Sequence, residues 1–245
     1  LSTQPNGRNI NEGCGALHPE RAAQAVIDHG ADVGICLDGD ADRVVFCDEK
    51  GQIIDGDRVL CLCAKALKAK GKLQGNTLVA TVMSNLGLRD ALEKDGISLE
   101  ITGVGDRLVI ERMREKGFNL GGENSGHIIY SDHATTGDGI MSALMVLSMM
   151  RKKNVTLSTL ADCMDIYPQV LLGLDVTEKP PIEEVPEIHK AIQVAETAFA
   201  EKGRVLVRYS GTERKIRVLT ECSDSELAQT HADLIAAAIK NTIGA

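Results

Sequence analysis

Short apolar stretches alternate with amphipathic stretches along the first part of the chain, and this alternation constrains the fold more than any other feature. The apolar stretches have the length of buried strands, and one of them consists mainly of β-branched residues. Strands are expected at 33–37, 44–47, 77–82, 99–102, 118–120 and 127–130, and helices at 19–29, 57–70, 86–94, 107–116 and after Gly137. Thr136 is the expected N-cap of the last of these helices. Strands that alternate with helices indicate α/β layers around a largely parallel sheet.

The sequence changes character after Pro168. A proline-rich stretch leads into an amphipathic helix pattern, which is followed by two strands around a tight polar turn and by a final helix with polar start signals. These elements are expected at 187–202, 204–208, 215–220 and 223–241. The pattern predicts a separate, smaller α+β domain over 167–245.

The charge balance argues against a nucleic-acid or membrane-surface protein. Lys and Arg number 27 against 35 Asp and Glu, which gives a net charge of −8, whereas phosphate-rich surfaces attract basic proteins. With three Phe, three Tyr and no Trp, the chain has few aromatic side chains on which single-stranded bases could stack. The longest apolar run, 140–150, is interrupted by two serines and is shorter than a membrane helix requires. We therefore expect neither nucleic acid nor a membrane among the partners.

The seven cysteines lack the spacing of a metal site or a disulfide framework. No C-x-x-C pair occurs, and their number is odd. Cys36 and Cys47 fall in apolar strand patterns, whereas Cys61 and Cys63 fall in a helical pattern. We interpret them as small buried hydrophobic residues in a reducing compartment. Residues 1–10 have no apolar core of a secretory signal, so a cytoplasmic protein is expected.

An acidic loop, Asp38-Gly-Asp40-Ala-Asp42-Arg43, lies between two of the expected strands. Three carboxylates at alternate positions crowd negative charge, which is costly unless a cation lies among them or protons are retained. Oxygen ligands suit a hard divalent ion, Mg²⁺ or Ca²⁺. The loop and Glu49 match the acidic positions of an EF-hand, but Arg43 stands where that loop needs Gly, and a strand follows instead of a helix. An exposed acidic turn remains the alternative, but we expect a small Mg²⁺ site.

A polar turn between the two C-terminal strands has the composition of a phosphate site. It contains two hydroxyl side chains and a glycine, and four cationic side chains flank it: Arg208, Arg214, Lys215 and Arg217. Backbone N–H groups, hydroxyl donors and an Arg fork are what a phosphate monoester requires. The alternative is a hairpin turn with solvated cations on an edge strand.

The glycine-rich loop at 121–127 carries three polar residues at alternate positions, Glu123, Ser125 and His127. Side chains at alternate positions could point one way and bind sugar hydroxyls, and a simple loop of small residues is the alternative. A second glycine pattern begins at Gly103, but Leu108 occupies the third glycine position of a dinucleotide-binding fingerprint. We therefore do not expect a dinucleotide cofactor.

The ordered set of these loops resembles the α-D-phosphohexomutase superfamily. The acidic loop comes first, the glycine-rich loop at 121–127 second and the polar turn between the two C-terminal strands third, all on α/β units. The similarity is greatest to the bacterial members that act on glucosamine phosphates, and it covers nearly the whole chain. The matching segments are 9–15, 38–43, 83–88, 103–107, 122–127, 132–139 and 210–213.

The resemblance implies a four-domain isomerase that interconverts glucosamine 6-phosphate and glucosamine 1-phosphate on the route to UDP-N-acetylglucosamine and peptidoglycan precursors. Family members use Mg²⁺ and a phosphoserine, and the reaction passes through a glucosamine bisphosphate. By this resemblance, 1–50 is the end of domain 2, 51–166 is domain 3 and 167–245 is domain 4. The implied partners are the glucosamine phosphates and the N-terminal domains of its own chain, and a homodimer is left open.

The resemblance also implies roles for individual residues. Asp38, Asp40 and Asp42 would hold Mg²⁺, and Arg43 would add positive charge beside them as a supporting catalytic residue. Glu123, Ser125 and His127 would contact the sugar, and Arg208, Ser210, Gly211 and Thr212 would hold the phosphate that does not react.

Two departures from the family pattern qualify these expectations. Arg214 follows the Ser-Gly-Thr-Glu segment where the family usually has Pro. The first domain, with its Ser-His-Asn phosphoserine loop, has no counterpart in the sequence, so we expect a fragment that lacks the nucleophile and is inactive alone. Two alternatives remain: a phosphomannomutase/phosphoglucomutase, and a truncated paralogue that binds hexose phosphates without catalysis.

Overall fold

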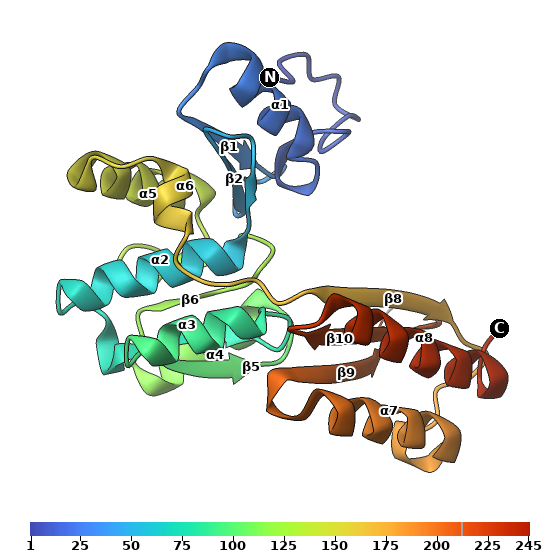
Figure 1. The fold of residues 1–245 in the computed structure, drawn as a ribbon. Coiled ribbons are helices and arrows are strands. Elements are labelled where there is room, and N and C mark those ends of the chain that lie inside the picture. The colour runs from blue at the N-terminus through green and yellow to red at the C-terminus, as the bar shows by residue number, and fades with distance from the viewer. Residues whose placement is uncertain (212) are drawn as a thin grey trace. The chain divides into compact units, whose positions relative to one another are not determined.

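The structure is a computed structural model that describes residues 1–211 and 213–245 (Figure 1). The chain forms two compact units, Leu1–Asp165 and Ile166–Ala245, hereafter unit 1 and unit 2. None of the described helices combines the length and apolar character that a bilayer crossing requires.

Unit 1 begins with an antiparallel sheet that carries the acidic loop. Its strands are β1 (Val33–Leu37), β2 (Val44–Asp48) and β3 (Ile53–Ile54), preceded by η1 (Gly15–Leu17) and α1 (Glu20–His29). The sheet order is β1-β2-β3, and the register pairs Leu37 with Val44 at the mouth of the hairpin. A parallel pair needs a crossover of a dozen or more residues, whereas only the loop 38–43 joins β1 to β2. The prediction of a largely parallel sheet is therefore wrong for this part of the chain.

The rest of unit 1 has helices on both faces of a mixed sheet, with strand order β5-β4-β6-β7. β4 is parallel to β5 and β6, and β7 returns antiparallel to β6. The parallel prediction is thus confirmed for β5-β4-β6 and wrong for β7. The strands are β4 (Thr77–Thr81), β5 (Ser98–Thr102), β6 (Leu120–Gly122) and β7 (Ile128–Tyr130); the helices are α2 (Gly56–Ala69), η2 (Gln74–Asn76), α3 (Leu86–Lys94), α4 (Asp106–Lys116), α5 (Gly139–Lys153) and α6 (Leu157–Ala161).

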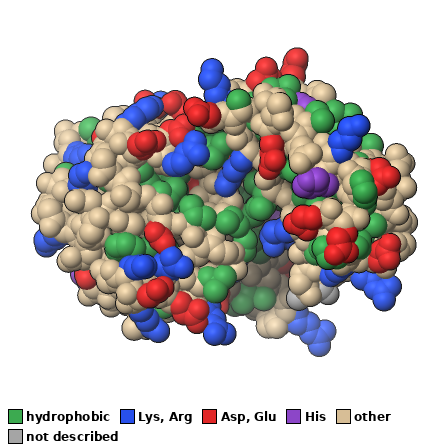
Figure 2. Space-filling model, turned by 90° about the horizontal axis from the view of Figure 1, so that it is seen from below, with side chains coloured by type: hydrophobic (Ala, Val, Ile, Leu, Met, Phe, Trp, Pro, Cys, Tyr) green, Lys and Arg blue, Asp and Glu red, His purple; other side chains and the backbone are tan. Residues whose placement is uncertain are grey.

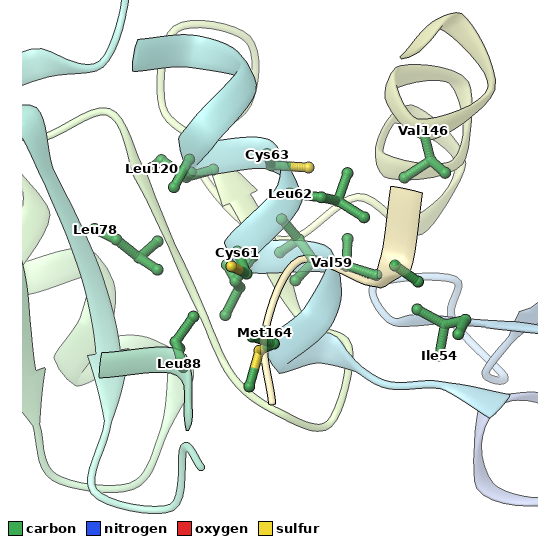
Figure 3. Packing of buried hydrophobic residues seen from close by; sticks show 14 of the residues in the cluster. Ile54, Val59, Cys61, Leu62, Cys63, Leu78, Leu88, Leu120, Val146 and Met164 are labelled. Carbon is green, nitrogen blue, oxygen red and sulfur yellow. The ribbon is translucent and has the colours of Figure 1, made fainter. Parts of the chain in front are cut away.

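The central strand β4 is buried on both faces, which explains its continuous apolar sequence. Because successive strand residues face opposite sides, Leu78 packs in the main core with α2 and α3 (Figure 3). Val79 faces the other way and packs with Val109 and Met113 of α4. The main core continues from β4 through α2 to Phe46 of β2. One hydrophobic core therefore holds both sheets of unit 1 in place.

Unit 2 is a three-stranded antiparallel sheet with two long helices. Its elements are β8 (Gln169–Asp175), η3 (Ile182–Glu184), α7 (Pro186–Phe199), η4 (Ala200–Lys202), β9 (Gly203–Tyr209), β10 (Lys215–Cys222) and α8 (Ser225–Thr242), with strand order β8-β10-β9. Ile188 of α7 and Ile235 of α8 pack on Ile216 and Val218 of β10 in a separate core. The predicted fold class, layered α/β followed by a smaller α+β part, is confirmed.

Figure 2 shows Lys and Arg side chains interspersed with Asp and Glu on the face that it draws. The predicted burial is confirmed for Cys36, Cys47, Cys61 and Cys63, whereas Cys14 and Cys163 are partly exposed.

Candidate functional site

The acidic loop of the β1–β2 hairpin gathers its three carboxylates. Asp38, Asp40 and Asp42 each offer one oxygen, and these oxygens lie within 4.8 Å of one another. The loop turns at Ala41, which has a left-handed backbone (φ 60°), and the Ala41 N–H donates to the Asp38 carbonyl at 3.2 Å. The Arg43 N–H donates to Asp38 Oδ1 at 3.1 Å. Local backbone bonds therefore bring together the charges that the sequence places at alternate positions.

The environment of Asp42 has the character of a cation site. Burial and a hydrogen bond shared with the Asp38 carboxyl raise its pKa, and the repulsion of Asp38 and Asp40 adds to this. Asp42 Oδ1 is buried and accepts no hydrogen bond from the described residues. Arg43 Nε approaches Asp38 Oδ2 at 3.7 Å and Asp42 Oδ1 at 3.8 Å, which are ion pairs too long for hydrogen bonds. A divalent cation would relieve this crowding, and an all-oxygen donor set fits Mg²⁺ or Ca²⁺.

Glu49, which matches the last EF-hand position, binds elsewhere. Its two carboxylate oxygens accept hydrogen bonds from the hydroxyl and the backbone N–H of Ser158, at the start of α6. The structure thus agrees with the exclusion of an EF-hand.

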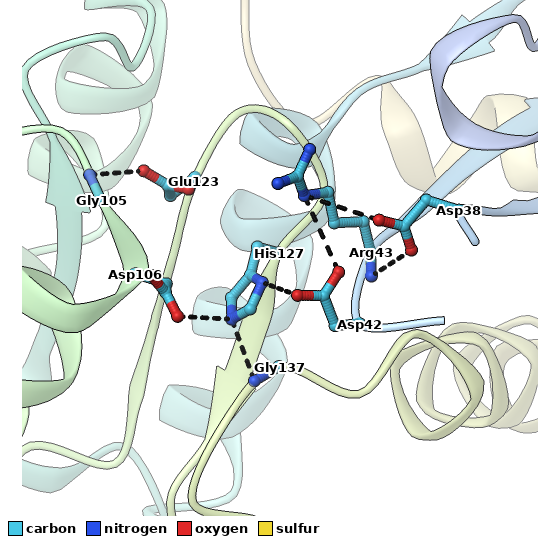
Figure 4. A network of polar contacts seen from close by, with 8 residues as sticks. All are labelled: Asp38, Asp42, Arg43, Gly105, Asp106, Glu123, His127 and Gly137. Atoms are coloured by element: carbon cyan, nitrogen blue, oxygen red, sulfur yellow. Dashed lines mark hydrogen bonds and ion pairs between the residues drawn. The ribbon is translucent and has the colours of Figure 1, made fainter. Parts of the chain in front are cut away.

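His127 links the acidic loop to two other segments (Figure 4). Its side chain is 2% exposed, and Nδ1 lies 3.1 Å from Asp42 Oδ2. Nε2 accepts a hydrogen bond from the Gly137 N–H at 3.0 Å. Because Nε2 is the acceptor of that bond, Nδ1 is the ring nitrogen that donates to Asp42. Asp106 Oδ2, at 3.9 Å from Nε2, is beyond hydrogen-bond distance.

The three polar residues of the glycine-rich loop do not share one direction. His127 points inward to Asp42, whereas Ser125 is exposed. Glu123 is half-buried, and its Oε1 accepts the Gly105 N–H at 3.0 Å (Figure 4). In this conformation Glu123 and Ser125 remain candidates for contact with a sugar, and His127 is placed to orient a candidate metal ligand.

Backbone hydrogen bonds join the loops of this site. The Val44 N–H donates to the Gly126 carbonyl at 3.0 Å, and the Gly139 N–H donates to the Ala41 carbonyl at 2.9 Å. A Cβ on Gly137 would lie 2.6 Å from His127 Nε2, so only glycine fits there. Sequence reasoning did not assign Gly137 and Gly139 a role in joining the loops. The local signal for such a role is the Gly-Asp-Gly segment at 137–139.

The predicted phosphate turn joins β9 to β10 in unit 2. Thr212 lies outside the described residues. Ser210 is buried: its N–H donates to the Lys215 carbonyl at 2.8 Å, and its Oγ accepts the Glu213 N–H at 3.2 Å. The Ser210 hydroxyl therefore keeps its own proton to donate. Gly211 is exposed, and a Cβ built on it would meet no heavy atom within 4 Å.

Positive charges converge on this turn from both strands. Arg208 of β9 is directly opposite Arg217 of β10, and like charges in that position repel each other. Arg217 reaches Glu213 Oε2 at 3.4 Å. Lys179, which sequence reasoning missed, donates from Nζ to the Ser210 carbonyl at 2.6 Å. No local pattern could have found Lys179, because 31 positions separate it from Ser210.

The chain is similar over its whole length to curated phosphoglucosamine mutases. The relative from Anaeromyxobacter dehalogenans is 50% identical over 244 residues, which cover 100% of this chain and 53% of the relative. The relative from Bacillus pumilus is 46% identical over 244 residues and is covered to 54%. The chain thus spans about half the length of the curated relatives it matches.

Solved structures share the fold. Aspergillus fumigatus N-acetylphosphoglucosamine mutase, in complex with GlcNAc-6P and magnesium, has a TM-score of 0.74 at 23% identity, over 94% of this chain and 53% of that chain. A phosphoglucomutase/phosphomannomutase family protein from Burkholderia thailandensis has a TM-score of 0.74 at 20% identity, over 92% of this chain and 50% of that chain.

Two domain families match directly and together cover most of the chain. Residues 55–167 match the phosphoglucomutase/phosphomannomutase alpha/beta/alpha domain III, and residues 171–238 match the C-terminal domain of the same family. The motifs, the fold and both matches agree. The chain belongs to the phosphoglucomutase/phosphomannomutase family of phosphohexomutases and carries its domain III and its C-terminal domain.

Proposed function

We propose that the chain is the metal-, sugar- and phosphate-binding part of a cytoplasmic phosphoglucosamine mutase, which interconverts glucosamine 6-phosphate and glucosamine 1-phosphate. The observation that carries this proposal is the identity of about 50% over the whole chain to phosphoglucosamine mutases. The acidic cluster and the cationic turn support it. A phosphoryl transfer between sugar hydroxyls needs a cation that neutralises the transferred group and a site that binds the other phosphate.

In the proposed mechanism, Asp38, Asp40 and Asp42 hold Mg²⁺. When bound, Mg²⁺ would neutralise the charge on the phosphoryl group during transfer. His127 holds Asp42 through its Nδ1 proton and thereby fixes the orientation of one ligand. Arg43, whose guanidinium lies beside two of these carboxylates, adds positive charge at the same place.

The substrate would be held at two ends. Glu123 would accept hydrogen bonds from sugar hydroxyls, and Ser125 would donate a hydrogen bond to one of them. Arg208, the Ser210 hydroxyl and the backbone around Gly211 hold the phosphate that does not react, and Thr212 is assigned to the same group by its position in the motif. Because the phosphate can be on either end of the sugar, a grip based on charge serves both orientations.

The phosphoryl group itself would come from a phosphoserine in the part of the protein outside this chain. The phosphoserine P–O bond breaks as a bond forms from phosphorus to the free sugar hydroxyl, which gives the bisphosphate. The other phosphate then returns to the serine, so no phosphate is gained or lost.

A substitution in the acidic loop tests this proposal. In the full-length protein, Asp40→Asn should abolish the Mg²⁺-dependent conversion of glucosamine 6-phosphate, because it removes one of three metal-binding charges. Asp32→Asn, which changes an exposed carboxylate outside the cluster, is the matched control. Conversion would be followed by coupled synthesis of UDP-N-acetylglucosamine. Activity equal to that of the control would remove the acidic loop from the site.

Substrate choice separates the proposal from its nearest enzymatic alternative. The full-length protein should convert glucosamine phosphate with a higher kcat/KM than glucose or mannose phosphates. A preference for mannose or glucose phosphates would indicate a phosphomannomutase/phosphoglucomutase instead. Binding of hexose phosphates by the full-length protein without turnover would indicate the non-catalytic paralogue.

A further inference from the structure

Two cysteines from distant parts of unit 1 meet beside α2. Cys61 lies on α2 and is fully buried, whereas Cys163 follows α6 and is half-buried. Cys61 Sγ donates to the Cys163 carbonyl at 3.5 Å, although 102 positions separate the two residues. Cys163 Sγ donates in turn to the carbonyl of Arg58, one turn earlier on α2, at 3.6 Å. Figure 3 shows Cys61 near Met164, the residue after Cys163.

The charges around Cys163 favour its thiolate. Lys65 Nζ donates to the Cys163 carbonyl at 2.8 Å and also pairs with Asp95 at 3.1 Å. The neighbouring Cys61 thiol lowers the pKa of Cys163 against the opposing effect of burial, and the positive charges of Lys65 and Arg58 lower it further. The same contact and burial raise the pKa of Cys61. The two thiols are therefore unequal: Cys163 is partly accessible and has a lowered pKa, whereas Cys61 is buried and has a raised pKa.

The other five cysteines do not combine these properties. Cys222 is buried in the core of unit 2. Cys36 and Cys47 also interact, on neighbouring strands, but both are buried in the small core beside α1. Cys63 is buried and accepts the Tyr130 hydroxyl at 2.8 Å. Cys14 is half-exposed, but it belongs to neither thiol pair. Reactivity of a thiol follows thiolate character together with access, and Cys163 has both beside a second thiol.

We propose that Cys163 and Cys61 form a peroxide-reactive pair, a modification site separate from the phosphohexomutase site. The Cys163 thiolate attacks one oxygen of a hydroperoxide, the O–O bond breaks, and the leaving oxygen takes a proton to become water or an alcohol. Cys163 is then a sulfenic acid. Cys61 sulfur attacks the Cys163 sulfur, the S–O bond breaks, and the hydroxyl leaves as water with the Cys61 proton. The two thiols supply the two electrons that reduce the peroxide.

The test uses the whole chain and hydrogen peroxide in equimolar amount. After digestion without reductant, mass spectrometry should find one linked pair of peptides, Cys61 to Cys163, two hydrogen atoms lighter than the separate peptides and cleaved by dithiothreitol. In Cys61→Ser, the sulfenic acid at Cys163 should persist and be trapped by dimedone. Cys36→Ser, which breaks the other thiol pair, should leave the Cys61–Cys163 link unchanged.

A measurement on the unmodified sequence guards against variants that fail to fold. Iodoacetamide should alkylate Cys163 about tenfold faster than the buried Cys36, Cys47 and Cys61 in the native chain, and all should react alike in urea. Equal native rates would overturn the proposal. So would oxidation at Cys14 or between Cys36 and Cys47 that leaves Cys163 intact, or a sulfenic acid at Cys163 that never links to Cys61.

Discussion

Gly137 has no room for a side chain between the acidic loop and His127. A Cβ there would lie 2.6 Å from His127 Nε2 and 2.7 Å from the Asp42 carbonyl. Gly137→Ala should therefore push the two loops apart and lower the free energy of unfolding by about 1–3 kcal/mol, the usual cost of overpacking. Urea denaturation of the chain would measure this loss.

The same substitution should weaken the proposed binding of Mg²⁺, because the Gly137 N–H fixes the ring that holds Asp42. Gly173→Ala is a suitable control, since a Cβ on Gly173 would meet no heavy atom within 4 Å. If both alanine variants had the same free energy of unfolding, the close approach at Gly137 would not contribute to stability.

For single residues, the sequence predicted which side chains gather at the site better than the directions in which those side chains point. The charges of Asp38, Asp40 and Asp42 are enough to predict crowding wherever the loop turns. The expectation that His127 points the same way as Glu123 assumed an extended backbone between them. Gly126 has φ 93°, which breaks that alternation. The cap of α5 shows the same limit: Asp138 accepts the Met141 N–H, although Thr136 has equally good capping chemistry, so that prediction is wrong.

At the scale of elements, Glu49 attaches the end of β2 to the first turn of α6. Burial raises the pKa of Glu49, but hydrogen bonds from Ser158 and Thr156 outweigh it and lower the pKa to about 2 from 4.5. A carboxylate with a lowered pKa stabilises the folded state fully above its unfolded value, and the stabilisation is lost as pH falls through the folded value. We therefore expect this contribution to disappear between pH 4.5 and about 2.

Comparison with Glu49→Gln isolates this contribution, because Gln keeps an acceptor oxygen but does not titrate. The difference in free energy of unfolding between the two proteins should be largest above pH 5 and should shrink as the pH is lowered toward about 2. Glu12→Gln, at an exposed carboxylate, should track the unmodified chain at every pH. A difference independent of pH would show that Glu49 does not act through its charge.

Elements with a clear hydrophobic period were predictable, whereas the strand β8 and the short elements β3 and α6 were missed. β4 is apolar throughout because both of its faces are buried. β8 has Val170, Leu172 and Leu174 on its inner face, but Leu171 on its outer face is also apolar and is 56% exposed. The alternation that identifies a half-buried strand is therefore blurred in β8.

At the scale of the whole molecule, unit 2 contains everything that its core needs. All three strands of its sheet and both covering helices lie within Ile166–Ala245. A fragment of residues 166–245 should therefore fold alone and unfold cooperatively with heat, as followed by circular dichroism.

Packing variants show whether that fragment has the native core. Ile188→Val, at a fully buried position, should lower its free energy of unfolding by about 0.5–1.5 kcal/mol. Val194→Ala, at a half-exposed position, should change it much less. A broad melt that neither substitution alters would mean that unit 2 does not fold by itself.

The division of the first part of the chain at residue 50 stays a prediction, because it came from family resemblance and not from a linker in the sequence. The core explains why no linker marks it. Phe46 of β2 and Val59 of α2 belong to one hydrophobic cluster, so residues on either side of that boundary pack together. Near Pro168, in contrast, the composition changes close to the point where the chain passes from unit 1 to unit 2.

The opposed pair Arg208 and Arg217 should make the heat stability of unit 2 a reporter of the proposed phosphate ligand. Glu213 offsets part of the charge of Arg217, and an anion between the two arginines would relieve the repulsion that remains. A ligand that binds only the folded state stabilises it by about 2.7 kcal/mol at one hundred times its Kd. The melting temperature should thus rise in phosphate relative to chloride of equal ionic strength. Arg208→Gln should melt higher in chloride and lose the response, so that a buffer screen can identify the anion without any assay of turnover.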